Sequence, residues 1–197
     1  MEKKIRTIAT LSTHSFSVSL DDVLLQNGAS GRRIRIDHPE AAAVVPFVSE
    51  EHLLMVRQFR YALGKETLEI PAGKMDPGEK PEECARRELL EETGFEADLF
   101  QSVLTYAPAI GYSNELIHIF SARQLRKMNA EVDEREISSV EKVSLDQLKD
   151  MVGRGLIEDG KTLLALSFMG LINESRIQNT RSQNPAWGHF MKDRPLK

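Results

Sequence analysis

The feature that most constrains this chain is a glutamate-rich helix predicted over residues 81–93. A proline at its first position and a glycine directly after its last are typical helix boundaries. Glu88, Glu91 and Glu92 stand at positions i, i+3 and i+4, so the helix places three carboxylates on one face. Such a face repels itself unless a counter-ion binds to it.

The counter-ion that suits this face is a hard divalent cation. Mg²⁺ and Mn²⁺ prefer oxygen ligands, and shared carboxylates can hold two ions roughly 3.5–4 Å apart. A turn bounded by Gly73 and Gly78 precedes the helix, so backbone groups can approach whatever the carboxylates hold. Arg87 is within reach of Glu91 and of Glu79, and we expect it to fix the carboxylates. The pattern predicts a site that positions a metal-bound diphosphate.

A glutamate-rich helix is most often a solvated surface, but the spacing here is more specific than that interpretation requires. Seven residues of fixed type fall at fixed positions: Gly73, Glu79, Arg87, Glu88, Glu91, Glu92 and Gly94. Chance agreement is on the order of 10⁻⁸ per starting point. The pattern matches the box of the Nudix hydrolase superfamily with no departure, and this resemblance argues against the solvated surface.

Segments outside the box resemble one branch of that superfamily, the ADP-ribose pyrophosphatases, which also includes GDP-mannose hydrolases. These segments are Arg57–Tyr61, Glu69–Gly73, Pro108–Glu115, Asp133–Glu136 and Asp159–Thr162. The resemblance implies an α/β fold, the Nudix α/β/α sandwich with a mixed β-sheet, plus a small N-terminal β-appendage. It also implies a homodimer in which the N-terminal strands exchange, because a small appendage buries little by itself.

Three regions are expected along the chain: an N-terminal β-appendage that dimerises (1–40), a Nudix hydrolase domain (41–174) and a polar C-terminal tail (175–197). Apolar and β-branched runs and turn residues predict the elements. The expected strands are two or three within 16–36, then 41–48, 53–58, 66–70, 97–107, 116–122 and 137–143. Further helices are expected from the cap at Ser144 to about 153, and over 161–172.

The resemblance assigns metal-binding roles by position. It makes the Ala72 carbonyl, Glu88 and Glu92 ligands of Mg²⁺ or Mn²⁺, and Glu91 a further ligand or the holder of the attacking water. A glutamate of the later acidic loop supplies another ligand or the general base. We expect Glu134 and Glu136 to share these duties.

Substrate-binding roles are carried over in the same way to Arg57, Arg60, Glu69 and Glu115. Arg57 is a candidate to act from the partner subunit. For both arginines the alternative is a surface position at a strand end, and for Glu115 it is a side chain that caps a loop.

The segment Gly155–Thr162 fits the phosphate-loop pattern GxxxxGK[ST], but its context does not. A phosphate loop follows a buried strand, whereas the preceding residues are expected to be helical. Glu158 and Asp159 would also place carboxylates where a phosphate must sit. We therefore interpret the match as coincidental.

Composition limits the partners and the compartment. The formal net charge is −4, which disfavours general binding to nucleic acid phosphates. The longest apolar stretch, 41–48, is too short to cross a bilayer, and no apolar segment follows the first lysines. A single cysteine cannot form an internal disulfide. We expect a cytoplasmic protein with no membrane or nucleic acid partner.

The leading hypothesis is metal-dependent hydrolysis of a nucleoside diphosphate sugar, such as ADP-ribose or GDP-mannose, to a nucleoside monophosphate and a sugar phosphate. One alternative keeps the enzyme and changes the substrate to a dinucleoside polyphosphate, NADH or capped RNA. Another is a nucleotide-sugar sensor without turnover, which the three self-repelling carboxylates disfavour.

Overall fold

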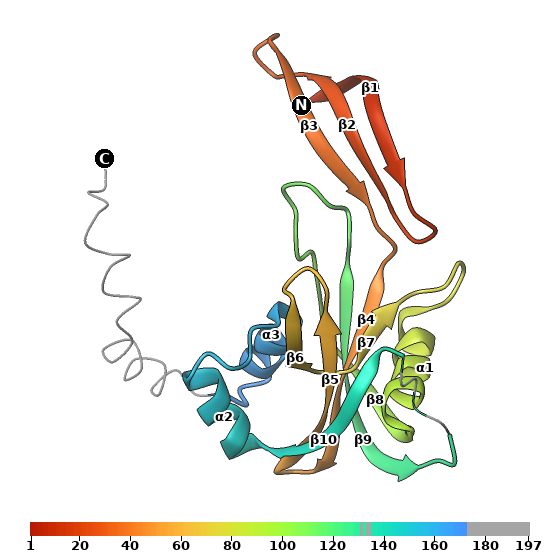
Figure 1. Ribbon diagram of the computed structural model, residues 1–197, viewed down its shortest axis with the longest axis vertical. Coiled ribbons are helices and arrows are strands. Elements are labelled where there is room, and N and C mark those ends of the chain that lie inside the picture. Colours follow the sequence, from red (N-terminus) through yellow and green to blue (C-terminus); the bar gives the residue numbers. More distant parts are fainter. Residues whose placement is uncertain (131, 133–134, 173–197) are drawn as a thin grey trace, which may run out of the picture.

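The computed structural model describes residues 1–130, 132 and 135–172, which form two β-sheets (Figure 1). The smaller sheet is antiparallel and consists of β1 (Lys3–Ser12), β2 (Ser17–Leu24) and β3 (Ser30–Asp37). The larger sheet has seven strands, which are β4 (Ala41–Ser49), β5 (His52–Arg60), β6 (Lys65–Glu69), β7 (Ala72–Lys74), β8 (Phe95–Tyr106), β9 (Ile117–Lys127) and β10 (Ile137–Ser144). It is a mixed sheet, because β4 pairs parallel to β9 whereas its other pairs are antiparallel.

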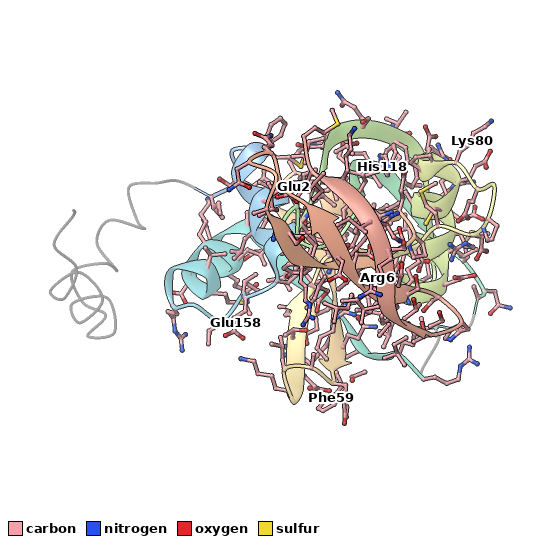
Figure 2. The ribbon with its side chains drawn as sticks, turned by 90° about the horizontal axis from the view of Figure 1, so that it is seen from above. Glu2, Arg6, Phe59, Lys80, His118 and Glu158 are labelled. Carbon is pink, nitrogen blue, oxygen red and sulfur yellow. The ribbon has the colours of Figure 1, made fainter. Side chains whose placement is uncertain are left out.

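In the described part of the chain, three helices cover the large sheet from opposite sides, so the prediction of an α/β/α sandwich is confirmed. They are α1 (Pro81–Thr93), α2 (Leu145–Gly153) and α3 (Gly160–Phe168). In Figure 1, α1 lies on one side of the strands and α2 and α3 on the other. Figure 2 shows the same separation from above, with Lys80 and Glu158, which precede α1 and α3, at opposite margins.

Strand β4 is the centre of the sandwich because both of its faces are apolar. Val45 and Phe47 pack with the apolar side chains of α2 and α3, whereas Ala42 and Val44 pack with Ala85 and Leu89 of α1. A strand covered on both faces has no position for a polar side chain. This explains the uninterrupted apolar run that begins at residue 41.

The boundaries of α1 and α2 follow from their capping residues. Gly94 ends α1 with φ +70°, a conformation that favours glycine, and its N–H donates to Leu90 O at 2.8 Å. Ser144 begins α2, where its hydroxyl accepts from the Gln147 N–H at 3.1 Å. Both helices match their predicted spans.

The N-terminal sheet leaves apolar side chains in solvent. Leu11, Val18 and Ile36 stand side by side across its three strands, and Leu20 and Ile34 lie two residues along on the same face. Leu11 is 70% exposed and Ile34 is 55% exposed. The described residues of a single chain therefore leave this apolar face partly uncovered.

Hydrogen bonds join the N-terminal sheet to the loop that precedes β9. The Ile36 N–H donates to Tyr112 O at 2.7 Å, and the Asn114 N–H donates to Ile36 O at 3.3 Å. The Asn114 side chain accepts from the His38 N–H at 2.9 Å. The end of β3 and this loop are thus held together by their backbones.

Several predicted boundaries need correction. The sequence did not predict β1, whose ten residues are all exposed and carry no regular apolar alternation. The helix expected over 161–172 ends at Phe168, and Gly170 beyond it has φ +69°, which is incompatible with a continuing helix. Strand β8 begins two residues earlier than expected and β9 ends five residues later, because Phe95 pairs with Lys127 and extends the hairpin into polar sequence.

No helix in the described part of the chain is both long enough and apolar enough to span a bilayer. The tail expected over 175–197 lies outside the described residues.

Packing of α1 on the sheet should account for a measurable part of the stability. Leu89 is fully buried, so Leu89→Ala should lower the free energy of unfolding by about 3 kcal/mol. Leu99→Ala, at a position 52% exposed, should change it by less than about 1 kcal/mol. Urea denaturation of both variants tests this, and equal losses would contradict the proposed packing.

Candidate active site

Helix α1 buries two of its three clustered glutamates. Glu88 and Glu92 are one turn apart and are only 9% and 6% exposed, whereas the Glu91 side chain is 53% exposed. The expected common face therefore divides into a buried pair and a carboxylate at the solvent edge. The buried pair faces strand β7.

A single guanidinium connects the carboxylates around α1. Arg87 donates to both oxygens of Glu79, at 2.9 and 3.0 Å, and its Nη1 reaches Glu88 Oε1 at 2.6 Å and Glu91 Oε2 at 3.0 Å. Its Nη2 also donates to Lys74 O at 3.0 Å. The pairing with Arg87 lowers the pKa of Glu79 to about 2. These contacts confirm that Arg87 fixes the carboxylates.

The backbone of β7 lies directly against the buried pair. The Ala72 N–H donates to Glu92 Oε2 at 2.9 Å. A Cβ atom added to Gly73 would lie 2.0 Å from Glu88 Oε1, far inside van der Waals contact. Glycine at position 73 therefore leaves the space that the Glu88 carboxylate occupies.

The positive charge around the buried pair does not offset the burial of its carboxylates, although Arg87 pairs with Glu88. Burial, together with the charge of Glu88, raises the pKa of Glu92 to about 8, although the Ala72 N–H opposes this. Burial also raises the pKa of Glu88, as do the charges of Glu91 and Glu136, against the effect of Arg87. Two buried carboxylates beside a closely packed backbone suit a divalent cation.

The described residues contain no group of three or more His, Cys, Asp or Glu side chains already arranged around a metal position. The fit to a cation rests instead on the carboxylates of Glu88 and Glu92 and the adjoining backbone of Ala72 and Gly73. A backbone carbonyl is an ordinary ligand for such ions.

A second charged cluster adjoins this site. Arg60 donates to both oxygens of Glu69, at 2.7 and 2.6 Å, and the Lys161 ammonium group pairs with the same carboxylate. Burial opposes ionisation of Glu69, but these cations and the Thr67 hydroxyl outweigh it and lower its pKa to about 2. Glu69 is 2% exposed and its oxygens are occupied. These pairings hold the Arg60 guanidinium and leave the Glu69 carboxylate bonded to groups of the protein.

Arg57 and Glu115, the other predicted substrate residues, lie on different elements and have different partners. Arg57 Nε donates to Glu141 Oε1 on β10 at 2.7 Å, an ion pair between neighbouring strands. Glu115 precedes β9, and its Oε1 lies 3.5 Å from His38 Nδ1. Burial raises the pKa of Tyr106 to about 12, and the charges of Asp159 and Glu115 add to this effect. Tyr106 is thus within electrostatic range of both the Glu115 loop and α3.

Of the two loop glutamates expected to act in catalysis, Glu136 is described and Glu134 lies outside the described residues. Glu136 precedes β10, and its charge acts on Glu88. Glu136 is therefore near enough to Glu88 for its charge to raise the Glu88 pKa.

Comparison with known proteins agrees with this geometry. The family model described as the NUDIX domain matches residues 37–165. A methanol dehydrogenase activator of Bacillus methanolicus is 36% identical over 172 residues, which are 86% of this chain and 93% of the relative. This chain belongs to the NUDIX family.

A second relative and a solved structure are similar to this chain over most of its length. An ADP-ribose pyrophosphatase of Bacillus subtilis (strain 168) is 35% identical over 172 residues, which are 86% of this chain and 93% of the relative. A crystal structure of an ADP compounds hydrolase superimposes with a TM-score of 0.71 at 25% identity and covers 92% of this chain and 97% of that chain. The matched NUDIX domain contains α1, β7 and the first turn of α3, which are the elements that build the site.

Residues of α3 join the site although the sequence argument assigned them no role. The Asp159 carboxylate accepts from the Thr162 N–H at 3.0 Å and so caps α3, and the Lys161 ammonium group contacts Glu69. The carboxylate of Asp159 occupies the helix end where a phosphate loop would bind phosphate, which confirms the rejection of that pattern. The available sequence signal was a lysine and a threonine two and three residues after the helix cap Asp159.

Gly73→Ala should disturb the cation site without unfolding the protein. The new Cβ must displace the Glu88 carboxylate, and we expect Mn²⁺ affinity, measured by calorimetry, to fall about tenfold or more. The circular dichroism spectrum should not change, since the end of one side chain can move. Gly160→Ala is the control, because a Cβ there meets nothing within 4 Å. Unchanged affinity in Gly73→Ala would contradict the placement of Glu88.

Proposed function

We propose that this NUDIX protein is a metal-dependent hydrolase that splits the diphosphate of nucleoside diphosphate sugars, such as ADP-ribose or GDP-mannose, into a nucleoside monophosphate and a sugar phosphate. The observation that carries the proposal is the buried Glu88–Glu92 pair packed against the backbone of Ala72 and Gly73. The names of the Bacillus subtilis relative and of the similar crystal structure support the substrate class.

Glu88, Glu92 and the Ala72 carbonyl would hold the cation, with Glu91 as a further ligand or as the holder of the attacking water. Bound Mg²⁺ or Mn²⁺ supplies charge that neutralises the diphosphate and polarises phosphorus. Arg87 keeps Glu88 and Glu91 in place. The cation fits because the pair is buried and short of positive charge.

Hydrolysis requires a base for the attacking water. The water oxygen bonds to one phosphorus, the bridging P–O bond breaks, and the water proton passes to a carboxylate. We assign this base to Glu136 or Glu134, the other serving as a further ligand. The charge that Glu136 exerts on Glu88 supports the assignment.

Substrate contacts are assigned to Arg60, Arg57 and Glu115. Arg60 is held by both oxygens of Glu69, so its guanidinium is oriented before a substrate arrives. Arg57 is held by a hydrogen bond from its Nε to Glu141 Oε1. Glu69, the fourth residue expected in this group, acts on the substrate through Arg60.

Glu92→Gln should abolish turnover while the fold persists. The substitution removes a ligand charge, and we expect the rate to fall about 100-fold or more. The assay measures products from ADP-ribose, GDP-mannose, UDP-glucose, NADH, diadenosine polyphosphate and GTP, with Mg²⁺ and with a chelator. Glu82→Gln, an exposed glutamate of the same helix, is the matched control.

The products decide between the hypotheses. A nucleoside monophosphate from nucleotide sugars, lost with chelator and in Glu92→Gln, supports the proposal. Binding of a nucleotide sugar without product favours a sensor, and products from dinucleoside polyphosphate or NADH alone favour the alternative substrates. Glu92→Gln activity within about tenfold of the unmodified protein would contradict the metal assignment.

We also propose that the protein is a homodimer assembled through residues 1–40, and the apolar face of the N-terminal sheet supports this. A three-stranded sheet with Leu11 and Ile34 exposed gains stability when a second copy covers it. A cytoplasmic location and the lack of membrane or nucleic acid partners remain predictions from composition.

Ile34→Asp places a charge on that apolar face and should convert the dimer to a monomer in sedimentation experiments. Thr10→Asp is the control, because Thr10 pairs with Ser19 on the opposite face of the same sheet. A dimer that survives Ile34→Asp would exclude this face as the interface.

A further inference from the structure

The first turn of α3 is bonded to the segment that leads into the site. Thr162 Oγ1 accepts from the Ile70 N–H at 2.9 Å and donates to Asp159 Oδ2 at 2.5 Å. The Lys161 ammonium group pairs with Glu69, and with Asp159 at 3.1 Å. Thr162 is fully buried and Lys161 is 8% exposed. We call Asp159, Lys161 and Thr162 the α3 clamp.

The segment held by the α3 clamp continues directly into the backbone that faces the glutamates. Pro71 restricts the chain between Ile70 and Ala72, and its carbonyl accepts from the Val44 N–H at 2.9 Å. The next N–H, that of Ala72, donates to Glu92. The α3 clamp therefore helps to fix the backbone from Ile70 to Ala72, and the Ala72 N–H bonds to Glu92, an expected metal ligand.

The same clamp acts on a substrate residue. Lys161 and Arg60 share the Glu69 carboxylate, and the charges of both lower the pKa of Glu92 against the effect of burial. Glu69 therefore joins α3, Arg60 and the Ala72 segment in one buried network.

A buried lysine is not an efficient way to stabilise a core. The cost of removing an ammonium group and a carboxylate from water is large, and well-packed apolar residues of similar volume are often as stable. Geometry explains the lysine better, because it orients Glu69 and through it Arg60.

We propose that Lys161 and Thr162 are positioning residues, which fix the Ala72 backbone and the Arg60 guanidinium relative to Glu88 and Glu92. This inference rests on the proposed function for its effect on turnover. Its effect on cation binding is independent of any substrate.

The first test compares Thr162→Val with Thr162→Ser. Valine keeps the shape but removes the hydroxyl that holds the Ile70 N–H, whereas serine keeps it. We expect Thr162→Val to weaken Mn²⁺ binding, measured by calorimetry on folded protein, about tenfold, and to lower kcat about tenfold with less change in KM. Thr162→Ser should stay within about threefold of the unmodified protein in both measurements. If Thr162→Val lowered only the melting temperature and kept its Mn²⁺ affinity and kcat, the proposal would be overturned.

The second test uses Lys161→Met, which removes a positive charge near Glu92. If Lys161 acted only through its charge, its loss would tighten Mn²⁺ binding. Positioning predicts the opposite, a weaker affinity. Tighter binding in Lys161→Met would therefore overturn its positioning role.

These measurements separate the inference from the proposed function. If the unmodified protein binds Mn²⁺ but releases no product from any nucleotide sugar, the proposed function fails. Weaker Mn²⁺ binding in Thr162→Val, restored in Thr162→Ser, would still support the α3 clamp.

Discussion

The ion pairs of Arg87 are the interaction on which the rest of the site depends. One guanidinium reaches Glu79, Glu88 and Glu91 and also a backbone carbonyl of β7. It lets α1 bring several carboxylates together beside the sheet, and it fixes the turn before the helix against them. It does not neutralise them all, because Glu92 accepts its hydrogen bond from the Ala72 N–H and not from Arg87. The resulting deficit of positive charge is what a bound cation would satisfy.

The site lies around residues 69–73, which contact α1 in one helical layer and α3 in the other. Helix α1 supplies the carboxylates from one side, and α3 holds Glu69 and Ile70 from the other. Residues 69–73 pass between these layers, so both layers determine the position of their backbone. Central placement of β4 makes this possible, because its apolar faces anchor α1 on one side and the α2–α3 layer on the other.

The parts of the site that the sequence could predict are those with short separations along the chain. The glutamates of α1 and their contacts with Arg87 follow from helical spacing and from a turn of known length. The pairing of Lys161 with Glu69 joins residues 92 positions apart, and charge alone cannot select that partner. Strand β1 was missed for a related reason, since its exposed residues are held by pairing with β2 and show no apolar alternation.

The connection between β3 and the loop before β9 has a consequence for how such a protein can diverge. Ile36 bonds to Tyr112 and Asn114, and Glu115 follows directly in the same loop. A change in the twist or register of the N-terminal sheet must therefore be matched by a change in that loop. The surface proposed for assembly and the loop that carries Glu115, a proposed substrate contact, are joined by these hydrogen bonds, so a sequence change in one would constrain the other.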